Sequence, residues 1–265
     1  MHILGGIAAV LGVFVLLLNG GLYAWRAFIL RRVKSCEQDE TFGMLHTGAA
    51  FLEDCAALAA SIGLIPAGWF MTACAEHSGT RGGVVLLHDW GLNRGALWWL
   101  RRRLLRAGWT PICCTAYNAF SGDIAAAADR LRDSIETIAP AVVIGHGVGG
   151  LVARYFARHH PSTSVRRIVT LGTPHRGTLL SPPGGLRQLA PDSPLLRDMT
   201  TGDHVPQEFD VIAIQSRFDA TILPPMNAEY PRAFNIRVSG VGHYALLFSP
   251  KVYRLLIENL EAPLG

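Results

Sequence analysis

The stretch Ala141-Val-Val-Ile-Gly-His-Gly-Val-Gly-Gly150 decides the fold of this chain. An apolar run that suits a buried strand ends in a glycine-framed turn, and helical sequence follows at once. Such a turn bends the backbone sharply and holds its central residue above the sheet, which is typical of a nucleophile elbow. The central residue here is Gly147. A phosphate loop is the alternative, but no Lys-Ser or Lys-Thr pair follows, and the G-x-G-x-x-G pattern with a later acidic residue is missing.

Strand and helix signals alternate from about residue 80 to the C-terminus. This alternation predicts an α/β domain over 80–265, with a mainly parallel sheet and helices on both faces. Strands are expected over 83–88, 110–115, 141–144, 167–171, 211–215 and 235–238, and helices over 93–107, 124–138, 148–160 and 250–260. A Pro-, Gly- and Leu-rich segment without strand signals predicts a short cap near 178–206.

Motifs on both sides of the turn carry a resemblance to a known family. The turn reads Gly145-His-Gly-Val-Gly-Gly150 and continues as Leu151-Val-Ala-Arg154, and the next strand leads into Leu171-Gly-Thr-Pro-His-Arg-Gly-Thr178. From about Gly83 onward, the chain resembles bacterial triacylglycerol lipases and esterases of the α/β-hydrolase superfamily, whose elbow is Gly-His-Ser-x-Gly-Gly. The resemblance implies an α/β-hydrolase fold in which Gly147 occupies the position of the nucleophilic serine.

Asp219 and His243 lie where this resemblance implies the acid and the base of a catalytic triad. Asp219 follows the strand expected over 211–215, and His243 lies in a glycine-flanked loop after the last expected strand. The order of nucleophile position, acid and base is that of the fold. Asp219 would orient the imidazole of His243, which would act as a general base. A loop cap at Asp219 and a surface histidine at 243 are the alternatives.

The expected oxyanion side of the pocket is also altered. The family's His-Gly after the first matching strand appears here as His88-Asp89-Trp90-Gly91, so a carboxylate replaces a glycine. If Asp89 faces the pocket, its charge would oppose a developing oxyanion. It could equally cap the helix expected from residue 93. The backbone N–H of Val148 remains an expected oxyanion donor, and His146 and His88 are expected pocket residues.

Glycine has no hydroxyl or thiol, so a covalent acyl-enzyme at position 147 is excluded. One hypothesis is a lipase-like protein, impaired or inactive as a serine hydrolase, that binds a ligand or a protein partner. Another is an ester hydrolase in which the His243–Asp219 pair activates a water in the space that serine would fill. A third is a relocated nucleophile, for which Ser121, Ser216 or Cys113 are candidates. The remaining hypothesis is that the chain is a sequence variant of an active esterase.

The leucine-rich cap suggests an apolar acyl ester or a lipid-like ligand, although these leucines could equally be simple packing. They are Leu179, Leu180, Leu186, Leu189, Leu195 and Leu196. No cofactor and no metal are expected.

The N-terminus predicts a membrane anchor. Residues 1–25 contain no Asp, Glu, Lys or Arg, and 3–18 are almost continuously aliphatic, which is enough to cross a ~30 Å hydrocarbon core. Basic residues follow this run, whereas a cleaved signal peptide, the alternative, has them before it. We therefore expect a transmembrane anchor over 1–30 in a bacterial inner membrane, with membrane lipid as a partner.

Residues 31–79 are expected to form a helical linker. The uncharged stretch 55–75 fits a second span, an interfacial helix, or a helix packed on the domain. With one span the positive-inside rule leaves the domain in the cytoplasm, and with two it places the domain outside. The sequence therefore allows the domain to lie on either side of the membrane.

The composition supports contact with lipid and argues against nucleic acid. Half of the residues are hydrophobic, only 17% are charged, and the net charge is +4. The basic residues are scattered apart from a run at 101–106, which falls in an expected amphipathic helix. Five cysteines show no metal-ligand spacing, and adjacent Cys113 and Cys114 are expected to pack on opposite faces of a buried strand.

Overall fold

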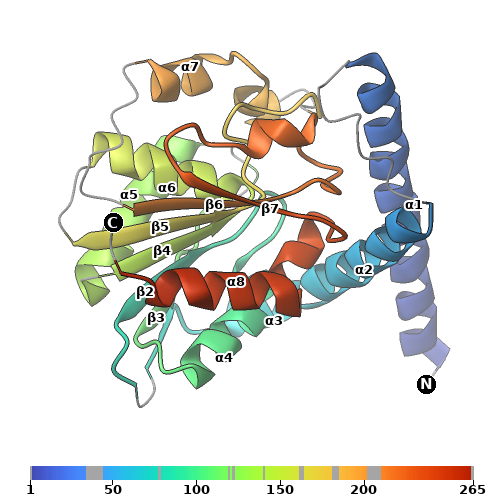
Figure 1. Ribbon diagram of the computed structural model, residues 1–265. Helices are drawn as coiled ribbons and strands as arrows, with labels where there is room; N and C mark the ends of the chain where they lie inside the picture. The colour runs from blue at the N-terminus through green and yellow to red at the C-terminus, as the bar shows by residue number, and fades with distance from the viewer. Residues whose placement is uncertain are drawn as a thin grey trace.

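The protein is built around a seven-stranded sheet with the order β1-β3-β2-β4-β5-β6-β7 (Figure 1). The computed structural model describes residues 2–33, 44–76, 79–118, 120, 123–139, 141–160, 164–180, 185–201 and 210–263. The strands are β1 (Cys74–Ala75), β2 (Gly83–Leu87), β3 (Ile112–Cys114), β4 (Ala141–His146), β5 (Val165–Leu171), β6 (Asp210–Ser216) and β7 (Phe234–Val238). Every neighbouring pair is parallel except β1 with β3, so the mainly parallel sheet is confirmed.

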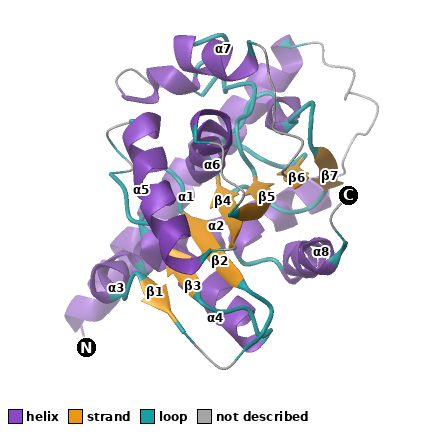
Figure 2. Ribbon diagram, turned by 90° about the vertical axis from the view of Figure 1, so that its left-hand side faces the viewer, coloured by secondary structure: helices purple, strands orange, loops and turns teal. Residues whose placement is uncertain are grey.

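Helices cover both faces of the sheet, as expected. Figure 2 shows α5 and α6 on one side and α4 and α8 on the other. The helices are α1 (His2–Arg32), α2 (Met44–Gly63), α3 (Ile65–Phe70), α4 (Trp98–Arg106), α5 (Ile124–Ile138), α6 (Val148–His159), α7 (Pro194–Thr200) and α8 (Pro250–Glu261). Short 3₁₀ turns are η2 (Arg94–Leu97), η3 (Gly185–Leu189), η4 (Pro225–Ala228) and η5 (Tyr244–Leu247).

Alternation along the strands divides the core between the two faces of the sheet. Val85 and Val143 pack toward α5 and α6, while Leu86 and Ile144 pack toward α4 and α8. All four side chains are buried, and each contributes about 1.5–3 kcal/mol relative to an exposed position. The sheet is therefore a rigid platform whose parallel strands all end at one edge.

The register of β2 and β4 brings two distant turns together. Leu87 pairs with Gly145, so the residues that lie two positions further along each chain leave the sheet side by side. These residues are Asp89 and Gly147. The pairing of two neighbouring strands thus sets the geometry of the candidate site.

Cys113 and Cys114 pack on opposite faces of the sheet as predicted, but Cys113 also has a covalent partner that the sequence did not indicate. Cys113 forms a disulfide with Cys74, because β1 pairs antiparallel with β3 and places the two residues opposite each other, with a Cα–Cα distance of 4.0 Å. The sequence showed no signal for the two-residue strand β1, which lies before the expected domain boundary at residue 80. Cys114, on the other face of β3, is buried and free as expected.

The uncharged stretch 55–75 is not one continuous helix. Helix α2 ends at Gly63, Pro66 lies in the first turn of the short α3, and β1 follows. Helix α2 lies against α1 and η5. A segment with these breaks could not cross a bilayer as one regular helix.

Helix α1 is, among the described residues, the one helix long and apolar enough to cross a membrane, over Ala9–Arg32. Signal sequences and core helices of soluble proteins share this length and composition. One side of α1 packs on α2, where Val15 meets Cys55 and Leu58, and the Asn19 side chain bonds the sulfur of Cys55. Much of its remaining surface is apolar and exposed, including Val10, Val13, Phe14 and Leu17.

Candidate active site

The turn between β4 and α6 has the geometry of a nucleophile elbow. Gly147 has φ 53° and ψ −120°, a conformation that costs a residue with a side chain on the order of 1–3 kcal/mol. Its N–H donates to the carbonyl of Leu171 at 2.9 Å, and its carbonyl accepts the hydroxyl of Thr173 at 2.9 Å. A Cβ on Gly145 would lie 2.5 Å from the backbone of Gly149, so β4 and α6 can approach this closely only because residue 145 is a glycine.

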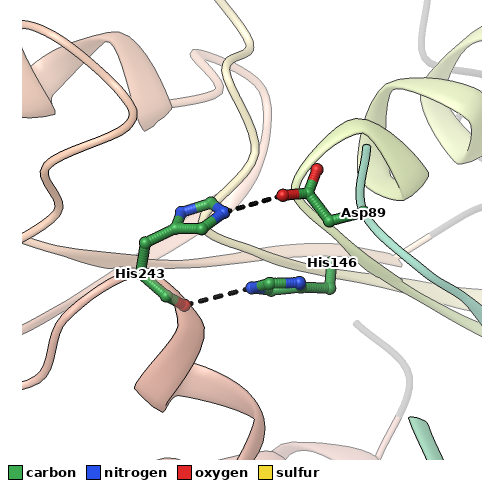
Figure 3. A group of neighbouring side chains, drawn as sticks. All are labelled: Asp89, His146 and His243. Atoms are coloured by element: carbon green, nitrogen blue, oxygen red, sulfur yellow. Dashed lines mark hydrogen bonds and ion pairs between the residues drawn. The ribbon is translucent and has the colours of Figure 1, made fainter. Parts of the chain in front are cut away.

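The carboxylate of Asp89 fills the volume that a side chain at position 147 would occupy. A Cβ built on Gly147 would overlap Oδ1 and Cγ of Asp89. Asp89 Oδ1 accepts the backbone N–H of Val148 at 2.7 Å, which is the expected oxyanion donor. Asp89 Oδ2 lies 3.0 Å from Nε2 of His243. The dashed line between the two side chains in Figure 3 marks this contact. A carboxylate therefore stands where a serine hydroxyl would face the histidine.

Asp219 and His243 are in direct contact on the opposite side of the imidazole. Asp219 Oδ2 lies 2.7 Å from Nδ1 of His243, and both side chains are buried. Asp219 Oδ1 accepts the backbone N–H groups of Thr221 and Ile222 and the Thr221 hydroxyl. Asp219 therefore combines the loop-capping role with the contact to His243, and the alternative of a surface position for His243 is wrong.

The imidazole of His243 lies between two carboxylates, and this sets its charge. Burial alone would lower the pKa of His243, but the charges and hydrogen bonds of Asp219 and Asp89 raise it well above the ordinary histidine value. Burial would raise the pKa of Asp89, but His243 lowers it to about 2. The pKa of Asp219 is likewise lowered by His243 against the effect of burial. At neutral pH the group is a cation held by two anions.

The other two predicted pocket residues support the loops around this group. The neutral ring of His146, whose pKa burial lowers to about 4, donates Nε2–H to the carbonyl of His243 at 3.1 Å (Figure 3). His88 donates Nδ1–H to the carbonyl of Asp89 at 3.0 Å and stacks on Tyr117. His146 thus fixes the backbone at His243, and His88 fixes the backbone at Asp89.

Asp89, His146 and His243 also form the kind of cluster that could hold a metal ion. One ligand atom from each residue lies within 4.8 Å of the others. The facing atoms of Asp89 and His243 are already hydrogen-bonded to each other, however, so a metal ion would have to displace that bond.

Several alternatives from the sequence are resolved by these contacts. Asp89 does not cap the following helix, because the Asn93 side chain accepts the N–H of Gly95 and does so instead. Among the relocated nucleophile candidates, Cys113 is in the disulfide, and the Ser216 hydroxyl bonds the carbonyl of Val241 and the N–H of Phe218. Ser121 lies outside the described residues.

A cavity of about 280 Å³ opens directly over Gly147, Asp89 and His243. Leu180 and Leu189 of the cap line it, but Leu179 is exposed, Leu195 and Leu196 lie away from it, and the Leu186 side chain lies outside the described part. Leu18 and Leu22 of α1 also line the cavity. This contribution was missed from the sequence, because α1 was interpreted only as an anchor.

Asp54 of α2 is a second group that sequence reasoning missed. Its Oδ1 accepts the N–H of Ala245 at 3.0 Å, and a Cβ on Gly242 would overlap its carboxyl. Burial raises the pKa of Asp54 to about 6. Nothing in the sequence distinguishes it from the adjacent Glu53. Asp54 thus links α2 to the loop that carries His243, because it contacts Gly242 before the histidine and Ala245 after it.

Comparison with known sequences finds partial matches. Residues 124–189, which include α5, the elbow and β5, match the family described as PGAP1-like alpha/beta domain. The chain is also similar to pimeloyl-[acyl-carrier protein] methyl ester esterases of Neisseria meningitidis, at 40% identity over 85 residues. That alignment covers 29% of this chain and 31% of the esterase, so it spans about a third of these curated relatives.

Solved structures agree on the fold. Aspergillus fumigatus lipase B matches with a TM-score of 0.58 and 15% identity, over 73% of this chain and 57% of the lipase. A Listeria innocua protein (17% identity, 69% of this chain, 95% of that protein) and an Exiguobacterium antarcticum esterase (13%, 71%, 95%) both give TM-scores of 0.52. The chain has the α/β-hydrolase fold and resembles lipases and esterases within it.

Proposed function

We propose that this chain is a membrane-anchored, lipase-like protein that binds an apolar acyl or lipid-like ligand and does not act as a serine hydrolase. The observation that carries the proposal is the position of Asp89. Its carboxylate occupies the nucleophile space and also takes the N–H of Val148. Because the N–H of Val148 is already bonded to the carboxylate of Asp89, it is not free to stabilise the oxyanion of a tetrahedral ester intermediate.

The cavity supports an apolar ligand. Its walls are mostly apolar, with Leu180 and Ile222 on the domain side and Leu22 on the α1 side. The central charges of Asp89, His243 and Asp219 are already paired with one another, so a ligand gains most by burying hydrocarbon against these walls.

The position of α1 supports membrane lipid as the source of this ligand. Leu18 and Leu22 of the proposed anchor face the cavity, while Val13 and Leu17 of the same helix are exposed. An acyl chain that leaves a bilayer along α1 would reach the cavity without crossing water. The anchor would therefore form part of the binding site in addition to attaching the domain.

The disulfide is evidence about the side of the membrane on which the α/β domain lies. Disulfides persist in oxidising compartments and are rare in the cytosol. The Cys74–Cys113 bond therefore supports a domain on the periplasmic side, against the positive-inside bias of a single span. Alkylation of the free thiols in intact cells, before and after reduction, tests this: if Cys74 and Cys113 are alkylated without a reductant, the domain is not oxidised in the cell.

The binding proposal is tested with the full chain in lipid nanodiscs and a fluorescent fatty-acid analogue. Leu180→Asp places a charge on the cavity wall, and we expect the analogue to bind on the order of tenfold or more weakly. Leu179→Asp is the matched control. Leu179 is the neighbour of Leu180 in the chain, but its side chain is exposed and does not line the cavity. Equal affinity in both variants would overturn the proposed site.

A second candidate function is ester hydrolysis by water activated by the His243–Asp219 pair, which the 2.7 Å contact between them favours. Two features oppose it: Asp89 fills the space for that water, and the two carboxylates beside His243 raise its pKa, which disfavours the neutral imidazole that a base needs. We expect no turnover of a p-nitrophenyl ester and no labelling by a fluorophosphonate. Turnover that His243→Ala abolishes would instead establish the second candidate.

A further inference from the structure

We propose that a second cavity, lined by α6, α7 and the loop after β5, binds the phosphate group of a phosphate monoester. Its volume is about 360 Å³. Figure 2 shows α7 above α6, and residues of both helices contribute to the lining. No described residue lines both this cavity and the one over Gly147, so the inference goes beyond the proposed function and does not rest on it.

The charged part of this lining consists of three arginines and one aspartate. Arg154 comes from α6, Arg176 from the loop after β5 and Arg197 from α7, while Asp192 lies just before α7. Three positive charges against one negative charge leave a net charge of +2 on the lining of this arginine cavity. A concave surface with an excess of arginine attracts anions, because the guanidinium groups carry the opposite charge and offer N–H donors to anionic oxygens.

Arg154 supplies a buried positive charge in the wall of the arginine cavity. Only 6% of the residue is exposed, and its guanidinium donates to the carbonyls of His175 at 2.7 Å and Met199 at 3.0 Å. The same group lies 4.5 Å from the ring centroid of Tyr230. Burial lowers the pKa of His175 well below the ordinary histidine value, and the charges of Arg154 and Arg176 lower it further. The wall therefore carries a fixed guanidinium beside a neutral histidine, and a ligand does not have to order either group.

The other two arginines have donors to offer to a ligand. The Arg197 side chain is exposed and, in the part of the chain that the structure describes, has neither a hydrogen bond nor an ion pair. Nη2 of Arg176 lies 3.6 Å from Oε2 of Glu229, whose other carboxylate oxygen contacts Arg237. Glu229 thus divides its charge between two arginines, and the Arg176 side chain remains 42% exposed. An anion in the cavity would be attracted by both exposed guanidinium groups.

The charge of the lining favours a phosphate monoester over other common anions. A phosphate monoester carries about −1.5 to −2 charges at pH 7 and has three strong acceptor oxygens. A carboxylate or a phosphodiester carries only one negative charge, so it gains less from a lining with a net charge of +2. The planar guanidinium forks of arginine also match the spacing of phosphate oxygens. The arginine cavity is therefore best suited to a phosphate monoester.

Asp192 is, among the described lining residues, the carboxylate that opposes an anion, and it provides a test of opposite sign. Its backbone has φ 60°, a conformation that asparagine adopts as readily as aspartate. Asp192→Asn therefore removes the negative charge and keeps the backbone. A gain in affinity from this variant could not result from misfolding.

The test is a calorimetric titration of the full chain, in nanodiscs of phosphatidylcholine, with glycerol 3-phosphate and with dihexanoyl phosphatidic acid. We expect Arg197→Gln to bind these phosphate monoesters on the order of tenfold more weakly than the wild type, and Asp192→Asn to bind them more tightly. Arg132→Gln is the control for net charge, because Arg132 lies on α5 outside the cavity and its side chain is 45% exposed. It should bind like the wild type.

The two probes distinguish a free phosphate ester from a lipid head group. Equal affinities for both would assign the site to small phosphate esters, and tenfold or tighter binding of the phosphatidic acid would assign it to a lipid head group. Dihexanoyl phosphatidylcholine, whose phosphate is a diester, should not bind. The proposal would be overturned if neither monoester bound, if the phosphatidylcholine bound as tightly as the phosphatidic acid, or if the wild type, Arg197→Gln and Asp192→Asn bound the monoesters equally.

Discussion

The two halves of the candidate site differ in how closely they follow the pattern of the family that the chain resembles. The acid–base half, on the loops after β6 and β7, has Asp219 and His243 in the expected order and in direct contact. The nucleophile half, on the turns after β2 and β4, has Asp89 and Gly147 at the positions where the resemblance leads us to expect glycine and serine. Because Asp89 fills the volume left free at Gly147, these two changes form one complementary exchange. The difference teaches that a missing nucleophile must be judged together with the groups that surround it.

Reversing the exchange should have the largest effect. In Gly147→Ser alone, the new Cβ overlaps Asp89 in a positive-φ position, so we expect about 2–4 kcal/mol of destabilisation and no ester hydrolysis. Asp89→Gly with Gly147→Ser removes the overlap and frees the N–H of Val148. This double variant should hydrolyse a p-nitrophenyl ester on the order of a hundredfold or more above the wild type and react with a fluorophosphonate.

Asp89→Gly alone is the control for that experiment, because it frees the oxyanion donor without supplying a hydroxyl. It should stay inactive on the ester. Equal turnover by Gly147→Ser and by the double variant would contradict the complementary exchange, since Asp89 would then be no obstacle to serine.

Removing one carboxylate at a time should show whether Asp219 or Asp89 holds the imidazole of His243 more strongly. Asp219→Asn weakens the 2.7 Å pairing with the imidazole and disturbs the bonds to Thr221, so we expect a loss of about 3–5 kcal/mol in urea unfolding at pH 7. Asp89→Asn keeps an oxygen for the N–H of Val148 and leaves His243 paired with Asp219, so the loss should be about 1–2 kcal/mol.

The surface offers a matched aspartate–histidine pair. Asp198 lies 3.1 Å from His159, and both side chains are partly exposed. Asp198→Asn should change stability by less than about 0.5 kcal/mol, because solvent screens such pairs. A larger loss from Asp89→Asn than from Asp219→Asn would reverse the assignment of the acid–base half as the stronger anchor.

A pH-dependent effect is expected at Asp54, which supports the acid–base half from α2. Its pKa is raised to about 6, so the folded state binds this proton more tightly than the unfolded state, and ionisation destabilises the fold as pH rises from about 4 through about 6. Asp54→Asn should therefore be more stable than the wild type at pH 8, by on the order of 2 kcal/mol, and should lack this gain at pH 4.

Thermal or urea unfolding across this pH range measures the difference, with Glu258→Gln, at an exposed carboxylate on α8, as the control. A constant difference between Asp54→Asn and the wild type from pH 4 to 8 would show that Asp54 does not titrate as the burial of its carboxyl predicts.

The sequence of the elbow and of the segments around it was sufficient to predict most of the sheet. The strand over 141–144 and the helix from Val148 depend on local patterns, namely an apolar run, closely spaced glycines and a helical period, and the structure has both. The same local order predicted that Asp219 and His243 each follow a strand at the carboxyl edge of the sheet, where parallel strands bring their loops together.

What only the tertiary structure decided is contact between segments that lie far apart in the chain. The β2–β4 register places Asp89 against Gly147, and the antiparallel β1–β3 pair joins Cys74 to Cys113. Packing of α1 and α2 brings Leu18 and Asp54 to the site. Strand register and helix docking are set by the whole core, so residue types at single positions could not reveal them. The sequence by itself determined that serine is absent from the elbow, and the fold determined that a carboxylate occupies its space.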